Sequence, residues 1–219
     1  MQSNKRKGFL KSLAMLGLGL GLGLGMNASH AAGEKFVLIS HAPDSDSWWN
    51  TIKNSVKQAG EDFNVSVDYR NPPNGDLADM ARLVEQSAAR NYDGVIVSIA
   101  DFSVLQKPLD LVAAKKIPFV TINSGTLAQS EQLGAVMHVG QPEYEAGKGA
   151  GEKAKAAGIK SFVCVNHYAT NPSSFERCRG FAEAIGVDFK AATLDAGEDP
   201  TTIESKLSAY LRNNPKTQA

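Results

Sequence analysis

Residues 35–63, KFVLISHAPDSDSWWNTIKNSVKQAGEDF, decide the fold class. They begin with an apolar run of strand length, 35–40, followed by a polar loop. Apolar residues then recur every three or four positions, at Trp48, Ile52, Val56, Ala59 and Phe63. That spacing predicts a helix over 47–63 with one buried face. A strand that is apolar on both faces, followed by an amphipathic helix, is the repeating unit of parallel α/β sheets.

The same alternation continues along the chain. Further strands are predicted at 65–69, 95–99, 117–122 and 160–165, with a β-rich segment at 134–140. One helix is predicted to begin after Asp76, which would serve as its N-cap, and others are predicted over 103–115, 143–157 and 174–185. A last helix is predicted over 200–213, with Asp199 as its N-cap and Pro200 as its first residue. The fold class is therefore predicted to be α/β, with doubly wound parallel sheets flanked by helices.

The first 31 residues have the pattern of an export signal. Lys5, Arg6, Lys7 and Lys11 precede an uncharged apolar stretch at 13–26, and small residues follow up to Ala31. This order is typical of a secretory signal peptide. The apolar stretch is shorter than the roughly 20 residues that span a bilayer, and a retained anchor is the alternative. We predict cleavage after Ala31 or one residue later, location in a bacterial periplasm and no stable membrane insertion after cleavage.

The charge balance narrows the choice of partner. Removing the four basic residues of the signal from a total of 23 leaves 19 Lys and Arg against 23 Asp and Glu. A mildly acidic chain without basic clusters argues against nucleic acid as a partner.

Two cysteines, Cys164 and Cys178, lie in a chain predicted to be exported. Disulfides form in such compartments, and the spacing permits one. Two buried free thiols are the alternative, and the sequence leaves both open.

Ligands of open parallel sheets bind beyond the carboxyl ends of the strands. Hydrogen-bonding residues and both tryptophans follow the predicted strands there: His41, Asp44, Ser45, Asp46, Ser47, Trp48, Trp49, Asp101, Asn123, Ser124, Gln141, Asn166, His167 and Asn171. Aromatic faces beside hydroxyl-binding groups are typical of a sugar site. Trp48 lies on the helical stripe and can equally be a core residue, so Trp49 is the better ligand candidate.

Enzyme signatures are missing from the sequence. It contains no G-x-S-x-G and no H-E-x-x-H, and His41, His138 and His167 have no second histidine or cysteine at i+3 or i+4. The glycine-rich run 147–151 lacks the Gly-Lys-Ser/Thr of a phosphate loop and falls inside a predicted helix, where small residues allow close packing. We predict no catalysis, no metal and no cofactor.

Five segments occur in a characteristic order: FVLISHAPDSDSWW, YDGVIVSIAD, KKIPFVTINSG, VGQPEYEAGKGAGE and FERCRGFAEAIG. With them, the chain from about residue 35 onward resembles the type I periplasmic sugar-binding proteins. This ribose- and galactose-binding group has a two-lobed fold that is shared with lac-repressor-type sensor domains.

The resemblance implies particular ligand contacts. Trp48 and Trp49 would sandwich the sugar ring, Asp101 would bind hydroxyls, and Asn123 or Ser124 would occupy the position after the fourth strand. Many relatives carry Asp-Arg at that position, so Asn123-Ser124 is a departure. Phe175 is a second departure, since ribose-type relatives place a ligand arginine there, and the nearby Arg177 is expected to be structural. His167 can take over contacts from the second lobe, and Asp46 and Ser47 complete the predicted site.

We therefore predict the substrate-binding protein of an ABC importer, which captures a sugar or related polyhydroxy compound and delivers it to an inner-membrane permease. One alternative is a periplasmic sensor of the same fold that presents its closed form to a membrane receptor. A periplasmic hydrolase is the second alternative function. A DNA-binding repressor is disfavoured because an export signal occupies the place of its helix-turn-helix.

The predicted organisation is a signal peptide at 1–31, an N-terminal lobe at 34–124 and a partial C-terminal lobe at 125–219. The resembled fold crosses three times between lobes, and only one crossing, near 124–140, fits this sequence. We therefore expect a fragment of a longer protein with an incomplete second lobe. Apolar residues of the last helix, Ile203, Leu207, Tyr210 and Leu211, should lack part of their cover.

Overall fold

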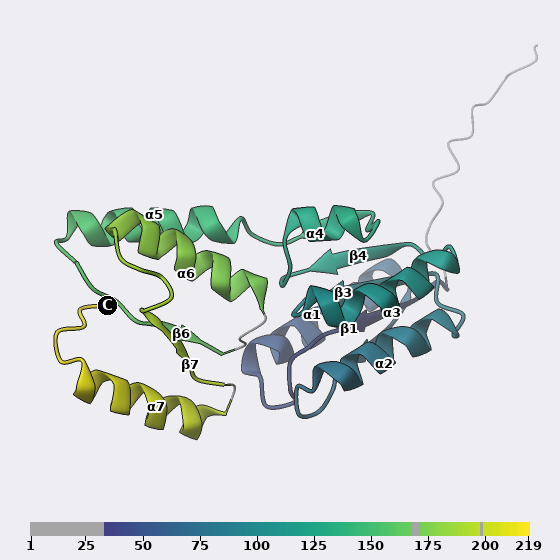
Figure 1. Ribbon diagram of the computed structural model, residues 1–219. Helices are drawn as coiled ribbons and strands as arrows, with labels where there is room; N and C mark the ends of the chain where they lie inside the picture. The colour runs from purple at the N-terminus through teal and green to yellow at the C-terminus, as the bar shows by residue number, and fades with distance from the viewer. Residues whose placement is uncertain (1–32, 168–170, 198) are drawn as a thin grey trace, which may run out of the picture. The chain divides into compact units, whose positions relative to one another are not determined.

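The structure is a computed structural model that describes residues 33–167, 171–197 and 199–219. The predicted signal peptide lies outside the described residues. The described chain forms α/β layers around two parallel sheets (Figure 1). It contains no helix that is both long and apolar enough to cross a membrane.

The first sheet has five strands, all parallel, in the order β2-β1-β3-β4-β5. The strands are β1 (Lys35–Ile39), β2 (Ser66–Arg70), β3 (Gly94–Ser98), β4 (Phe119–Ile122) and β5 (Met137–Val139). The chain builds outward in one direction to β2 and in the other to β3. The carboxyl ends of β1 and β3 therefore form a switch point, the usual ligand position in such sheets.

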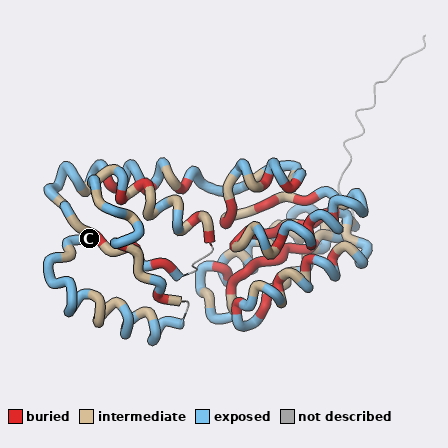
Figure 2. The backbone as a smooth tube through the Cα atoms, in the orientation of Figure 1, coloured by how far each residue is buried: buried red, intermediate tan, exposed pale blue. Residues whose placement is uncertain are grey.

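Helices cover both faces of this sheet because its strands are apolar on both sides. Val37 and Ile39 of β1 share a core with α2 (Leu77–Ala88) and α3 (Phe102–Ala114), whereas Leu38 packs with α1 (Ser47–Phe63) on the opposite face. Figure 2 shows the middle of this sheet buried, where β1 and β3 lie, and the outer sides of the helices exposed, whereas the edge strands β2 and β5 contain no buried residue. The predicted doubly wound architecture is confirmed here.

The predicted lobe boundary after residue 124 cuts through this sheet. β5 pairs in parallel with β4, with Val120 opposite Met137. A short helix, α4 (Leu127–Gln132), connects the two strands. The first sheet therefore continues to Val139, beyond the predicted lobe boundary at 124 but within the predicted crossing segment 124–140.

The second sheet is small and parallel, with two strands, β6 (Cys164–Asn166) and β7 (Thr193–Asp195). Around it lie α5 (Glu143–Ala156), α6 (Pro172–Ile185) and α7 (Pro200–Asn213). Its core contains Phe162, Cys164, Ala182 and Ala192. No residue of α7 is buried (Figure 2). Ile203, Leu207 and Tyr210 are half-buried and Leu211 is exposed, as expected for a helix with partial cover.

Glycines bring α5 and α6 together. An added Cβ at Gly147 would overlap the backbone carbonyl of Arg177, and one at Gly180 would overlap that of Tyr144. A Cβ at Gly151 would stand 2.7 Å from Cβ of Ala184. The predicted close packing is confirmed at Gly147 and Gly151, whereas a Cβ at Gly149 would meet nothing within 4 Å.

A disulfide joins Cys164 and Cys178, with 5.8 Å between their Cα atoms. It fastens β6 to the middle of α6. The sequence had left this bridge and two free thiols as alternatives.

The helical phase predicted for α1 was wrong at both ends. Trp48 and Phe63, placed on the buried stripe, are 52% and 68% exposed, whereas Trp49 is buried. Ile52 and Val56 do face the sheet, in the cluster that contains Trp49. Trp49 and Val56 are seven residues apart, two helical turns, so the buried stripe runs through Trp49 rather than Trp48.

Candidate ligand-binding site

A pocket of about 340 Å³ lies where four strands end. Its lining residues follow β1, β4, β5 and β6: His41, Asp46, Trp48, Trp49, Asn123, Ser124, Gln141, Glu143, His167, Asn171, Ser173, Ser174 and Arg177. The volume falls within the range of small-molecule sites. Polar side chains from both sheets thus meet two indole rings.

His41 stands at the switch point between β1 and β3. Its backbone N–H donates to Oγ of Ser98 (3.1 Å), and its Nδ1 is 2.9 Å from the same oxygen. Burial lowers the pKa of His41 to about 4; the neighbouring His167 lowers it further, and Asp46 raises it. His41 is therefore neutral at pH 7.

We expect the protein to lose stability on acidification through His41. Its pKa is near 6.5 when unfolded and about 4 when folded, so the unfolded state takes up the proton first. The stabilisation is complete above pH 6.5 and is lost as the pH falls toward 4, reaching a loss of roughly 2 kcal/mol at pH 5.

Urea unfolding at pH 7 and pH 5 measures this loss. His41→Gln should show a smaller loss of stability, because the variant lacks the His41 imidazole. Part of the loss should remain, because the pKa values of His138 and His167 are also lowered in the folded protein. Equal losses in the variant and the original protein would contradict the assignment.

The tryptophans have different roles in the structure. Trp49 is 4% exposed and packs with Leu38 and Ala42, while Trp48 is 52% exposed. Their ring centroids are 5.1 Å apart in an edge-to-face arrangement. The rings of His41 and Trp49 are also arranged edge to face, with 5.4 Å between their centroids. Trp49 thus supports Trp48, and Trp48 offers the larger accessible ring surface to a ligand.

Asp46 combines a structural role with an electrostatic one. Its carboxylate caps α1 by accepting a hydrogen bond from the backbone N–H of Trp49 (2.9 Å). Its charge also raises the pKa values of His41 and His167. Asp46 therefore fixes the start of the helix that carries the tryptophans and contributes negative charge to the pocket.

Asn123 and Ser124 connect the end of β4 to the segment after β6. Asn123 has φ 57°, a left-handed conformation that Asn tolerates better than most residues. Nδ2 of Asn171 donates to Oγ of Ser124 (3.3 Å), and Oγ of Ser173 donates to the carbonyl of Asn123 (3.4 Å). These bonds hold the first turn of α6 against the end of the first sheet.

The remaining wall comes from α5, α6 and the β6–α6 loop. Glu143, the first residue of α5, accepts hydrogen bonds from Gln141 (2.9 Å) and from Nε of Arg177 (2.6 Å). His167 lies near Ser174, with 3.4 Å between Nδ1 and Oγ. Burial lowers the pKa of His167, Asp46 raises it and Arg177 lowers it.

Six of the eight residues in the predicted ligand site line this pocket: Asp46, Trp48, Trp49, Asn123, Ser124 and His167. Ser47 and Asp101 do not. Ser47 is an exposed first residue of α1, and Asp101 caps α3 by accepting from the backbone N–H of Val104 (3.1 Å). Contact of either residue with a ligand stays a prediction.

Sequence reasoning missed Glu143, Ser173 and Ser174 as lining residues and treated Arg177 as structural. The rule that ligands bind beyond the carboxyl ends of the strands, which selected the other lining residues, could also have found these. Glu143 lies four residues past the end of β5, and Ser173 lies seven past the end of β6.

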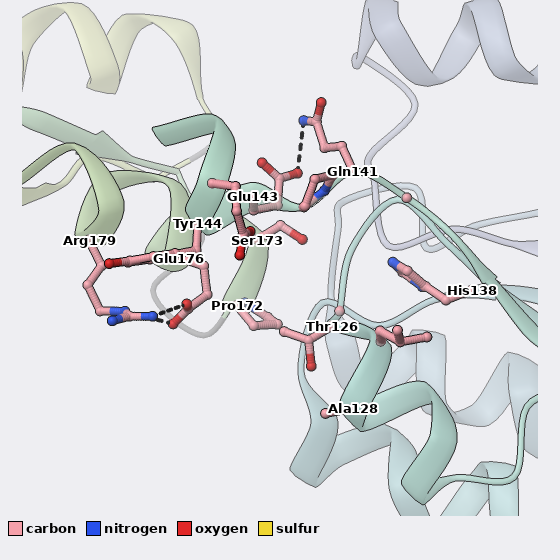
Figure 3. Close-up of a pocket in the computed structure, with 15 residues that line it drawn as sticks. Thr126, Ala128, His138, Gln141, Glu143, Tyr144, Pro172, Ser173, Glu176 and Arg179 are labelled. Atoms are coloured by element: carbon pink, nitrogen blue, oxygen red, sulfur yellow. Dashed lines mark hydrogen bonds and ion pairs between the residues drawn. The ribbon is translucent and has the colours of Figure 1, made fainter. Parts of the chain in front are cut away.

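A larger pocket of about 540 Å³ adjoins the first (Figure 3). It is formed by the β4–α4 turn, the end of β5 and the starts of α5 and α6, and shares Gln141, Glu143 and Ser173 with the smaller one. It contains neither tryptophan and no residue that follows β1. The smaller pocket is therefore the better candidate for a ligand site, although its volume is smaller.

Within the described ranges, no cluster of three or more His, Cys, Asp or Glu side chains could hold a metal ion.

These features are those of an α/β protein with a candidate ligand pocket at the strand ends. A family model described as a periplasmic binding protein domain matches residues 36–219. The chain belongs to the periplasmic binding protein family, whose members bind ligands rather than transform them. No curated protein sequence gives a significant match.

Solved structures agree on the fold. A carbohydrate transporter from Acidothermus cellulolyticus 11B, in complex with myo-inositol, superposes with TM-score 0.79 at 27% identity, over 85% of this chain and 64% of that one. An ABC transporter solute binding protein from Burkholderia graminis C4D1M, in complex with D-arabinose, gives 0.76 at 18% identity, over 86% and 65%. The chain thus spans slightly less than two thirds of either protein.

Proposed function

We propose that this chain acts as a periplasmic substrate-binding protein that captures a sugar or related polyhydroxy compound for an ABC transporter. The observation that carries the proposal is the pocket at the strand ends, where the exposed ring of Trp48 stands beside hydrogen-bonding side chains. The C–H face of a polyol packs on an aromatic ring while its hydroxyls bond to such groups.

The relatives support this ligand class. The Acidothermus protein is a carbohydrate transporter with bound myo-inositol, and the Burkholderia protein holds D-arabinose. The proposal includes export to the periplasm, delivery to an inner-membrane permease and no covalent chemistry, and it includes the predicted contacts of Asp46, Ser47, Asp101 and His167. A pull-down with solubilised inner membrane separates a permease from a receptor as the partner.

A thermal-shift screen tests ligand binding. We expect at least one of myo-inositol, D-arabinose, D-galactose and D-glucose to raise the melting temperature saturably, since a ligand at 100 times its Kd adds about 2.7 kcal/mol to stability. No shift with any neutral polyhydroxy compound would count against the proposal.

Trp48→Ala should weaken binding of the ligand found in that screen by about fivefold to tenfold, because the variant loses ring packing. Phe63→Ala is the matched control: Phe63 is the exposed aromatic at the other end of α1 and does not line the pocket. Calorimetric titration of both variants gives the comparison. Equal affinities in the two would show that Trp48 makes no ligand contact.

A further inference from the structure

We infer that Glu143 and Arg177 make the pocket selective for uncharged polyhydroxy ligands over the corresponding sugar acids. In this pair Glu143 orients the guanidinium and offsets its charge. The inference rests on the proposed function and specifies the ligand class within it.

Glu143 is a charged residue with almost no access to water. Its side chain is 5% exposed, and each carboxylate oxygen accepts one hydrogen bond, Oε1 from Gln141 and Oε2 from Arg177. Figure 3 shows the bond from Gln141. A buried carboxylate depends on such partners, so Glu143 fixes the positions of both side chains, which also line the pocket.

Arg177 has N–H donors that its bond to Glu143 does not use. Its guanidinium carries five N–H groups, and only the one on Nε is used by Glu143. Within the described residues, neither terminal nitrogen donates a hydrogen bond to another protein group. The side chain is 52% exposed and lines the pocket, so its planar fork can donate to two neighbouring ligand oxygens.

The charges around the pocket disfavour an acidic ligand. Asp46 and Glu143 are negative, and Arg177 is the one positive lining residue within the described ranges at pH 7. Burial lowers the pKa values of His41 and His167, which keeps both rings neutral. A carboxylate would approach two like charges and one cation that is already paired, whereas hydroxyls can donate to the acids and accept from the arginine.

A purely structural ion pair between α5 and α6 is the competing explanation. It predicts that breaking the pair lowers stability and weakens all ligands alike. Our inference predicts that neutral and acidic ligands respond in opposite directions. The ratio of the two affinities therefore separates the explanations.

The test compares Glu143→Gln with the original protein by calorimetric titration of two matched pairs, D-galactose with D-galacturonate and D-glucose with D-glucuronate. The original protein should bind a neutral sugar at least about tenfold more tightly than its acid. In the variant, the freed positive charge should strengthen acid binding and the loosened arginine should weaken neutral binding. We expect the ratio to contract by about tenfold, roughly 1.4 kcal/mol.

Glu176→Gln is the matched control. Glu176 forms an ion pair with Arg179 within α6 (Figure 3), and of the two pockets it lines only the larger one. Its selectivity ratio should equal that of the original protein. Circular dichroism and melting temperature establish that each variant is folded.

The outcomes are distinct. If the original protein binds none of these four compounds and the thermal-shift screen finds no other neutral polyhydroxy ligand, both the proposed function and the inference fail. If it binds a sugar but Glu143→Gln leaves the ratio unchanged, or if the acid binds more tightly from the start, only the inference fails. Should Glu143→Gln not fold, Arg177→Gln decides, because it leaves the negative charge of Glu143 unpaired: a larger loss of affinity for the acid than for the neutral sugar supports the inference, and equal losses or unchanged neutral binding overturn it.

Discussion

Gly147→Ala is expected to destabilise the part of the protein built on the second sheet by roughly 3 kcal/mol, the upper end of the cost of overpacking. The added methyl group would occupy the position of the Arg177 carbonyl. A backbone group in a helix cannot turn aside as a side chain can, so α5 and α6 must separate. Arg177 would move with α6, away from Glu143 at the start of α5.

Gly149→Ala, two residues along the same helix, is the control. A Cβ at Gly149 meets nothing within 4 Å, and replacing a mid-helix glycine with alanine favours the helix by roughly 0.5–1 kcal/mol. Urea unfolding followed by circular dichroism should therefore show shifts of opposite sign. A Gly147→Ala protein as stable as the Gly149→Ala protein would mean that the two helices do not pack this closely.

Strong local signals explain what was predictable in the fold. Helix α1 has the predicted bounds: Asp46 caps its start, and Asn64, in the left-handed conformation, ends it. The parallel sheet followed from strands that are apolar on both faces. Two short elements, α4 and β7, were not predicted. The first has six residues and the second three, too few to develop a periodic pattern.

The site was predictable to the extent that topology determines it. The strand-end rule selected most of the lining residues, because parallel strands all end at one edge of a sheet. It could not show that Asp101 is occupied as a helix cap, nor which of two adjacent indoles faces the pocket. Helical phase settles the second question, and a stripe of five apolar residues fits more than one phase. The Glu143–Arg177 pair depends on how α5 packs against α6, which no local pattern contains.

Breaking the Cys164–Cys178 disulfide is expected to lower the free energy of unfolding by about 3 kcal/mol. The bridge closes a loop between cysteines 14 residues apart, and the chain-entropy model gives about that value for a loop of this length. The effect should fall on the second sheet. Within the described residues, that sheet has two strands and its core has four buried residues, one of them Cys164 itself. Phe162, which precedes β6, packs on Phe181 of α6, so the bridge adds a covalent link to a small set of apolar contacts.

The double variant Cys164→Ala, Cys178→Ala and the reduced original protein should lose the same stability, and reductant should not affect the variant further. Alkylation of the unreduced protein followed by mass spectrometry should find no free thiol. Both tryptophans of the chain lie in α1, so their fluorescence reports on the first sheet, whereas circular dichroism reports on both. On reduction, the dichroism transition should move to lower urea than the fluorescence transition. Two alkylated thiols, or a reduced protein as stable as the oxidised one, would show that this bridge does not hold the second sheet together.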